Sequence, residues 1–286
     1  MIIRVRRIAA VCALGTALTA LAACSAPQPV RAPRATAGSA VASASPAAGP
    51  PTLAPGPAGL TPVFEHGPRT GDRAVALTFD ADMTADQGPR AARGERFDNP
   101  GLIAALRELK VPATVFMTGR WAEQYPGQAR SLGRDPLFEI ANHSYSHYAF
   151  TEDCYGLPTV DEERMRTDVE RAYAAFREAG VPDPMPYFRF PGGCHDTRAL
   201  RALTPAGVTA VQWDVVSGDA FATDAGAVAR EVLDGVRPGS VVVLHCTLSA
   251  APTTERVVRE VVPELRGKGF RFVKVSELIG ASGGRR

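Results

Sequence analysis

The chain has 286 residues, enough for one large domain or two ordinary ones, and its 45% hydrophobic content is normal for a globular protein. Its 32 basic and 30 acidic residues leave a net charge of +2, with no basic block beyond the first residues. This balance argues against a protein that binds nucleic acid through its phosphates.

Residues 1–24 have the pattern of an export signal. Basic Arg4, Arg6 and Arg7 precede an apolar run that is too short and too rich in small residues for a comfortable transmembrane span. The run ends in LAAC, which resembles the bacterial lipobox, where the cysteine, here Cys24, is lipidated and anchors the mature chain. We therefore expect an exported protein, lipid-anchored to the outer face of the bacterial cell membrane; an ordinary secretion signal with a chance cysteine is the alternative.

Residues 25–62 are mainly Ala, Pro, Ser and Gly. Such a segment cannot bury enough apolar surface to offset the entropy of ordering, so we expect a disordered tether. A single ordered domain is expected over residues 63–281.

Apolar strand-like segments alternate with amphipathic helical ones through this domain. The first strand is expected near the start of residues 74–84, where Val75, Leu77 and Phe79 alternate with other residues. A polar loop is expected over residues 86–98. Further strands are expected over residues 112–118, 138–142, 187–190, 210–214, 240–245 and 270–275, and helices over residues 100–109, 121–132, 160–179, 197–203, 225–236 and 253–268.

About seven strand-helix units predict the α/β class, with a parallel sheet and right-handed crossovers. Closure into a (β/α) barrel is the natural arrangement, and a doubly wound open sheet is the alternative. In a barrel the site lies at the carboxyl ends of the strands. Polar residues lie at or just beyond such predicted ends: Asp80, His143, Arg189, Asp219 and His245.

The sequence HSYSH places His143 and His147 four residues apart. In a helical turn both imidazoles would lie on one face, a spacing suited to a divalent metal. An upstream Asp at another strand end, such as Asp80 or Asp82, would complete an open site of two histidines and one carboxylate. Two surface histidines are the alternative interpretation.

Five segments in order, TFDADMT, HSYSH, RFPGG, WDVVSGD and VLH, resemble the motifs of the NodB-like polysaccharide deacetylases, carbohydrate esterase family 4. The stretch FDNPGLIAALRELKVPATVFMTG is also similar to theirs, and the resemblance extends over residues 73–278. It implies a distorted, incomplete (β/α) barrel of about seven parallel strands. It also implies removal of acetyl groups from sugars with a divalent metal, usually zinc.

The resemblance implies a role for each matching residue. Asp80 would be the catalytic base with Arg189 orienting it, and His245 the general acid with Asp219 as its partner. The expected metal ligands are His143, His147 and Asp82, and the expected substrate contacts are Pro191, Gly193 and Leu244.

The chain departs from the family pattern at several positions. The family's first motif has two adjacent acids, base and then metal ligand, but here Ala81 follows Asp80 and the second acid is Asp82. Strand alternation points residues 81 and 82 in different directions, so Asp82 could bind metal only if the chain leaves the strand at once. Further departures are Val216, Ala220 and Gly192, which replace an acid and two aromatics and imply a more open sugar groove.

We therefore expect a metal-dependent, monomeric hydrolase that deacetylates an N-acetylated polysaccharide, peptidoglycan or chitin-like, at the cell envelope. One alternative is an O-acetyl esterase acting on xylan or another acetylated glycan. Another is a catalytically weak domain that binds glycan or metal.

Five cysteines are present, of which Cys12 would leave with the signal and Cys24 would take lipid. Export permits disulfides, and three remaining cysteines allow one internal bridge. We expect it between Cys154 and Cys194, which lie in loops near the proposed site, with Cys246 free. Cys246 or His195 could replace the displaced acid as a metal ligand, but the interpretation we favour is that both are loop residues.

Overall fold

The computed structural model describes residues 49–283, and the predicted signal and most of the predicted tether lie outside this range. Within it the strands form one sheet in which every pairing is parallel, in the order β1-β6-β5-β4-β3-β2-β8-β7, with β9 pairing β2. The strands are β1 (Val63–Phe64), β2 (Ala74–Ala81), β3 (Ala113–Met117), β4 (Phe138–Asn142), β5 (Tyr187–Phe188), β6 (Thr209–Val211), β7 (Val215–Val216), β8 (Ser240–His245) and β9 (Arg271–Phe272).

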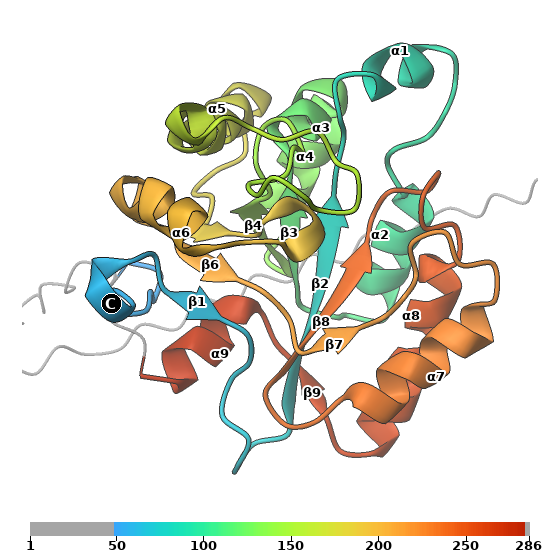
Figure 1. The fold of residues 1–286 in the computed structure, drawn as a ribbon. Coiled ribbons are helices and arrows are strands. Elements are labelled where there is room, and N and C mark those ends of the chain that lie inside the picture. The colour runs from blue at the N-terminus through green and yellow to red at the C-terminus, as the bar shows by residue number, and fades with distance from the viewer. Residues whose placement is uncertain (1–48, 284–286) are drawn as a thin grey trace, which may run out of the picture. The chain divides into compact units, whose positions relative to one another are not determined.

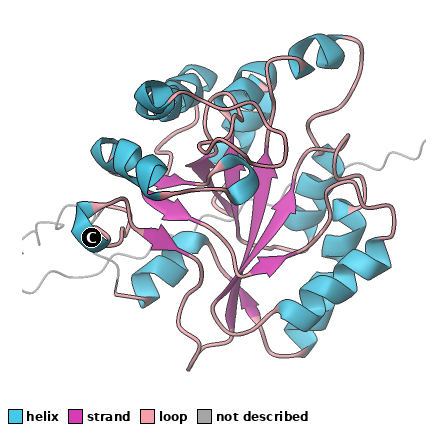
Figure 2. Ribbon diagram, in the orientation of Figure 1, coloured by secondary structure: helices cyan, strands magenta, loops and turns pink. Residues whose placement is uncertain are grey.

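Helices cover the outside of this sheet, which curls into a distorted, incomplete (β/α) barrel as predicted (Figures 1 and 2). The helices are α1 (Gln87–Ala92), α2 (Pro100–Glu108), α3 (Gly119–Gln124), α4 (Pro126–Gly133), α5 (Glu162–Ala179), α6 (Thr197–Leu203), α7 (Ala225–Gly235), α8 (Thr254–Gly267) and α9 (Val275–Ala281). No helix within residues 49–283 is long and apolar enough to cross a bilayer.

Strand β2 shows how the core positions the site. Val75, Leu77, Phe79 and Ala81 lie in the largest apolar cluster, together with residues of α2, α7 and α8. The alternate residues point the other way, because successive side chains of a strand face opposite sides. Ala74 and Ala76 belong to a second apolar cluster, so Asp80 stands at the carboxyl end of the face opposite Ala81.

The segment between β6 and β7, residues 212–214, bends from one end of the sheet to the other. The Gln212 amide donates to Phe64 of β1 at 2.8 Å, whereas the Asp214 amide donates to Val241 of β8 at 3.2 Å. Arg189 fills the inside of the bend and donates to the carbonyls of Val211 at 3.2 Å and Gln212 at 3.4 Å. This bend is a seam that joins the two ends of the sheet.

Residues 49–62, the end of the predicted disordered tether, lie against the domain. The Tyr187 hydroxyl donates to the Pro51 carbonyl at 2.8 Å, and the Leu53 amide donates to Thr209 Oγ1 at 3.3 Å. Leu53 also packs on the second apolar cluster. The packed part of the chain therefore begins before residue 63, the predicted domain boundary.

Candidate active site

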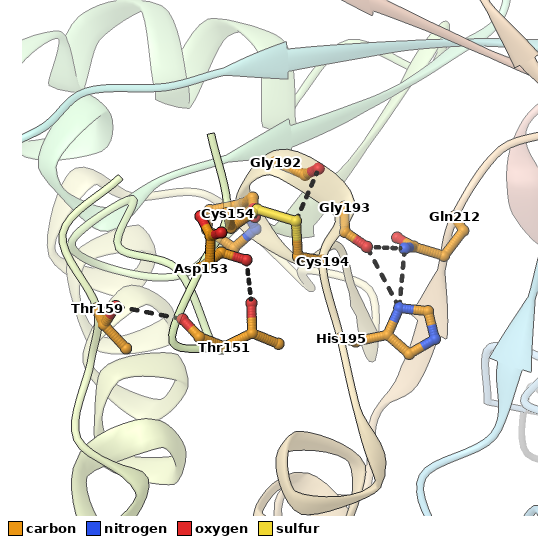
Figure 3. Close-up of a disulfide and its surroundings, with 10 residues drawn as sticks. Thr151, Asp153, Cys154, Thr159, Gly192, Gly193, Cys194, His195 and Gln212 are labelled. Carbon is orange, nitrogen blue, oxygen red and sulfur yellow. Dashed lines mark hydrogen bonds between the residues drawn. A yellow bond between two sulfur atoms is a disulfide. The ribbon is translucent and has the colours of Figure 1, made fainter. Parts of the chain in front are cut away.

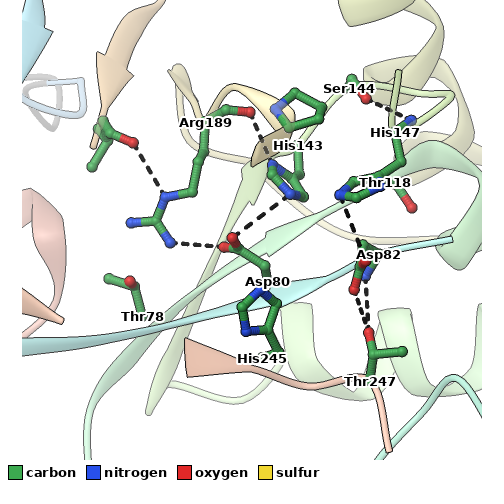
Figure 4. A network of polar contacts seen from close by, with 12 residues as sticks. Thr78, Asp80, Asp82, Thr118, His143, Ser144, His147, Arg189, His245 and Thr247 are labelled. Carbon is green, nitrogen blue, oxygen red and sulfur yellow. Dashed lines mark hydrogen bonds and ion pairs between the residues drawn. The ribbon is translucent and has the colours of Figure 1, made fainter. Parts of the chain in front are cut away.

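Asp80 is buried at the end of β2 and forms an ion pair with buried Arg189 (Figure 4). Arg189 Nη1 donates to Asp80 Oδ1 at 2.7 Å. Burial raises the pKa of Asp80, but interactions led by the positive charge of Arg189 outweigh it and hold the pKa below its usual 3.8. Asp80 is therefore an ionised carboxylate with one oxygen fixed by Arg189.

His245, the last residue of β8, is paired with Asp219 in the β7–α7 loop. The ring Nδ1–H donates to Asp219 Oδ1 at 2.8 Å, and the His245 amide donates to Asp219 Oδ2 at 2.8 Å. Burial lowers the pKa of His245, but the hydrogen bond and charge of Asp219 outweigh it and raise the pKa to about 9. His245 is thus an imidazolium at neutral pH, and its second nitrogen carries a proton.

Asp80 and His245 occupy paired positions of neighbouring strands β2 and β8. The two side chains lie next to each other in Figure 4, and each has its own buried partner. An ionised base and a protonated acid are therefore held side by side at one edge of the sheet.

The histidines of HSYSH meet through a loop rather than through the helical turn considered above. Ser144 and His147 both have positive φ, 70° and 59°, and the His147 amide donates to Ser144 Oγ at 2.8 Å. The rings of His143 and His147 lie edge to face with their centroids 5.0 Å apart. The loop that brings the two rings together therefore contains strained backbone at two non-glycine residues.

His143 has the protonation state of a metal ligand. Its Nδ1 is 2.9 Å from the Arg189 carbonyl, which can only accept, so Nδ1 carries the hydrogen. Burial lowers the pKa of His143 to about 4, so the ring is neutral at pH 7 and Nε2 keeps its lone pair. That Nε2 lies 3.7 Å from Asp80 Oδ2.

Asp82 faces away from the direction of Ala81, as strand alternation requires, and lies at His147. Asp82 Oδ2 is 3.5 Å from His147 Nε2, and the Thr247 hydroxyl donates to Asp82. Burial raises the pKa of Asp82, but His147, His245 and the Thr247 hydrogen bond outweigh it and lower the pKa overall. The displaced acid is therefore ionised and next to a candidate ligand.

These donors fit a divalent metal in type and in pairwise spacing. Two ligands on a tetrahedral ion with bonds of ~2.1 Å stand ~3.4 Å apart, and the Asp82 and His147 atoms are separated by 3.5 Å. As it stands, the described part of the chain has no group of three His, Cys, Asp or Glu side chains gathered as a complete metal site. Asp82 and His147 are thus spaced as two ligands of one metal ion, and His143 lies next to His147.

The three residues expected to contact substrate are buried or half-buried. Leu244 pairs with Phe79 and packs in the largest apolar cluster. Pro191 is buried, and a Cβ at half-buried Gly193 would lie 2.5 Å from the Trp213 ring.

The two residues considered as substitute ligands are not placed to bind a metal at His147. Cys246 is buried and free, and burial raises the pKa of its thiol to about 12, so it remains protonated. His195 stacks on Phe190, with ring centroids 5.2 Å apart, and its Nδ1 lies 3.2 Å from Gln212 Nε2. Figure 3 shows His195 beside the bridge that joins Cys154 and Cys194, which confirms that pairing.

Hydroxyl groups that the sequence pattern did not indicate support the site. Ser217 and Thr254 donate to the two oxygens of Asp219 at 2.9 and 2.6 Å, and Thr247 donates to Asp82. Thr247, two residues beyond His245, is the one whose position at a strand end could have been noticed. Thr254 begins α8, so nothing in its local sequence points to the site.

Known proteins similar to this chain belong to the family that its motifs resemble. The polysaccharide deacetylase family matches residues 67–211, half of the chain. A chitooligosaccharide deacetylase of Bradyrhizobium sp. (strain ANU 289) is 28% identical over 225 residues, 74% of this chain and 94% of that protein. A peptidoglycan-N-acetylglucosamine deacetylase of Bacillus cereus is 26% identical over 211 residues, 73% of this chain and 89% of that protein.

A solved structure is also similar. The crystal structure of a peptidoglycan N-acetylglucosamine deacetylase superposes with a TM-score of 0.63 at 25% identity, covering 79% of this chain and 96% of that one. Fold, motif order and family match agree. The chain is therefore a member of the polysaccharide deacetylase family, carbohydrate esterase family 4, whose enzymes are hydrolases of acetylated glycans.

Proposed function

We propose that this protein is a metal-dependent deacetylase that hydrolyses the N-acetyl group of an N-acetylglucosamine polysaccharide, chitin-like or peptidoglycan, at the cell envelope. The observation that carries the proposal is the pairing of ionised Asp80 with protonated His245 across β2 and β8. The chitooligosaccharide and peptidoglycan deacetylases that resemble the chain support this substrate class.

Asp80 takes the proton of the attacking water. Its Oδ1 is occupied by Arg189, so Oδ2 is the oxygen that is free to accept. The lowered pKa keeps this carboxylate ionised throughout the neutral range. Water oxygen then bonds to the acetyl carbon.

His245 gives a proton to the leaving nitrogen. Nδ1–H is held by Asp219, so Nε2–H is the group that points away from the pair and can donate. As the carbon–nitrogen bond breaks, the amine takes this proton and acetate departs. Asp219 keeps the imidazolium oriented and charged before the transfer.

His143, His147 and Asp82 would hold the divalent metal that this family generally uses. Their two imidazoles and one carboxylate suit zinc, which we propose as the natural ion. When bound, the ion polarises the acetyl carbonyl and lowers the pKa of water. Thr247 keeps Asp82 in position, and the Arg189 carbonyl fixes the tautomer of His143.

The test is acetate release from N-acetylglucosamine oligomers by protein that has been stripped of metal and then reloaded with zinc. We expect release only after reloading. Asp80→Asn and His245→Ala should each lower kcat about 10²- to 10⁴-fold, whereas Asp224→Asn, an exposed helix cap, serves as the control. Release from acetylxylan but not from these oligomers would contradict N-deacetylation, and full activity of either variant would contradict the mechanism.

The envelope location rests on residues 1–24, which lie outside the described range. We propose that Cys24 is lipidated and anchors the protein to the outer face of the cell membrane. Cys24→Ala should move the protein from the detergent phase to the aqueous phase on partitioning. Unchanged partitioning would show that the anchor is not this cysteine.

A further inference from the structure

Three large apolar side chains are exposed within residues 49–283. Tyr155 is 88% exposed, Phe221 is 83% exposed and Val216 is 57% exposed. All three lie at the carboxyl edge of the strands, in segments that also carry site residues. Water-exposed apolar groups gathered at one edge, while the remaining large apolar side chains are covered, indicate a binding surface.

Tyr155 is held in place beside the site. It follows Cys154 in the β4–α5 loop, and the Cys154–Cys194 disulfide ties this loop to the one that follows Arg189 (Figure 3). A Cβ built on Gly192 would lie 3.4 Å from Tyr155 Cδ2, so the ring stands over the glycine turn.

Phe221 is held in a similar way on another loop. It lies two residues after Asp219, and its amide donates to the Ala250 carbonyl at 2.6 Å, in the segment that follows His245. Val216, at the end of β7, is three residues before Asp219 and lines the same hollow as Phe221.

The backbone at both aromatic positions is strained. Tyr155 has φ 52° and Phe221 has φ 62°, values that favour glycine. An exposed ring on a strained backbone position gains no burial that would offset the strain. Strained backbone positions cluster at ligand-binding and active sites, and these two lie in loops that follow the strand ends of the site.

The sheet order separates the two rings. Strand β2, which carries Asp80, lies between β4, which leads to Tyr155, and β7, which leads to Phe221. A ligand that touches both rings must therefore extend across the edge above Asp80. An extended chain of sugars has this shape, and the flat apolar faces of its pyranose rings can pack on aromatic rings while the hydroxyls stay in water.

We propose that Tyr155 and Phe221 are stacking platforms, with Val216 beside Phe221, that bind sugar units on either side of the unit being deacetylated. This inference rests on the proposed function and sharpens it: it names the side chains that bind the polymer beyond the unit being deacetylated. The rings contribute to binding and leave the chemistry at Asp80 and His245 unchanged.

The test compares N-acetylglucosamine pentamers with dimers as substrates of the zinc-loaded protein. Tyr155→Ala and Phe221→Ala should each raise KM for the pentamer about 3- to 10-fold, with kcat retained. The double variant should raise it about 10- to 100-fold, because distant sites add. KM for the dimer should change less than KM for the pentamer, because a dimer can reach at most one ring.

Matched controls are available near both rings. Asp153→Ala, close to Tyr155 in the chain, and Ser249→Ala, next to the Ala250 that binds the Phe221 amide, remove exposed polar side chains and should leave KM unchanged. Tyr155→Trp and Phe221→Tyr keep an aromatic face and should retain affinity. Tyr155→Gly should raise Tm by relieving φ and still weaken binding, a combination that a merely structural ring would not give.

The outcomes separate the two proposals. If the wild-type protein releases no acetate, the proposed function fails, and equilibrium Kd for the same oligomers, measured on the same protein, still tests the rings. If the wild-type protein acts on the pentamer but the alanine variants keep its KM, the stacking platforms are wrong. Equal preference of the wild-type protein for dimer and pentamer would also overturn them.

Discussion

The carboxylate of Asp219 sets the charge of His245, the proposed general acid. It accepts four hydrogen bonds, from Ser217, from Thr254 and from the ring and amide of His245. These donors keep it ionised although it is fully buried. Its negative charge is the reason that the pKa of His245 rises to about 9.

The pH dependence of kcat/KM follows from this pair. His245 must be protonated to act, so kcat/KM should fall as pH rises through about 9. Asp219→Asn removes the largest raising influence on the pKa of His245, so this alkaline limb should move to lower pH. Profiles of kcat/KM from pH 5 to 10 for the variant and the wild-type protein measure this shift. If the alkaline limb does not move, it reports the titration of a group other than His245.

The free energy of unfolding should also depend on the protonation of His245, and it should fall as pH rises. The pKa of His245 is higher in the folded chain, about 9 against 6.5, so its contribution is complete below pH 6.5 and is lost between there and 9. The drop in the free energy of unfolding over this range should disappear in Asp219→Asn.

In the metal site proposed above, Asp82 takes the place of the family's second acid from one residue further along the chain, next to His147. Removing it, as Asp82→Ala, should weaken zinc binding more than Thr247→Val, which removes its hydrogen-bond donor and should cost about 10- to 100-fold in affinity. Competition with a chromophoric chelator measures both. Asp86→Asn, an exposed acid in the same loop, is the control.

Ala81→Asp sharpens this test. It restores the adjacent acids of the family, but Ala81 packs in the largest apolar cluster. The new carboxylate would face apolar side chains and should destabilise the fold without tightening zinc binding. Tighter binding in Ala81→Asp would show that Asp82 is not the ligand.

At the scale of elements, the Cys154–Cys194 disulfide connects the β4–α5 loop to the β5–α6 loop. It closes a chain segment with a sequence separation of 40. Changing both cysteines to serine should lower the free energy of unfolding by about 2–4 kcal/mol. Urea titration measures this difference. Reductant should bring the wild-type protein to the level of the variant and leave the variant unchanged, and insensitivity of the reduced wild-type protein would contradict the role.

Several short elements with a regular apolar pattern could be predicted from the sequence together with their bounds. The strands at residues 138–142 and 240–245 and the helix at residues 197–203 have the predicted bounds. Pro126 splits the helix expected over residues 121–132 into α3 and α4. Helix α1 was expected as loop because none of its residues is buried, so it has no apolar periodicity to detect.

Only those site residues that lie at the ends of strands could be predicted from the sequence. Asp80, His143, Arg189 and His245 meet because parallel strands end at one edge, which the sequence pattern indicates. The contact of Asp82 with His147 depends on strained loop residues, Ser144 among them, whose positive φ no periodicity reveals. The supporting hydroxyls depend on tertiary packing for the same reason.

At the scale of the whole molecule, residues 49–62 add packed surface that composition alone did not indicate. A chain that begins at residue 63 loses the Leu53 packing and the Pro51 bond to Tyr187. Its free energy of unfolding should be lower by about 2 kcal/mol than that of a chain beginning at 49. Leu53→Ala in the longer chain should show part of the loss. Equal urea midpoints for the two chains would show that this segment contributes nothing.

Arg189 belongs to two structures at once. Its guanidinium orients Asp80, and it also holds the carbonyls of Val211 and Gln212 in the bend where the ends of the sheet meet. A population of variants screened for heat resistance alone, with no demand for turnover, should therefore still keep this arginine. An inactive relative could therefore retain this arginine for its structural role alone. The presence of the arginine is then no evidence that the relative is, or once was, an enzyme.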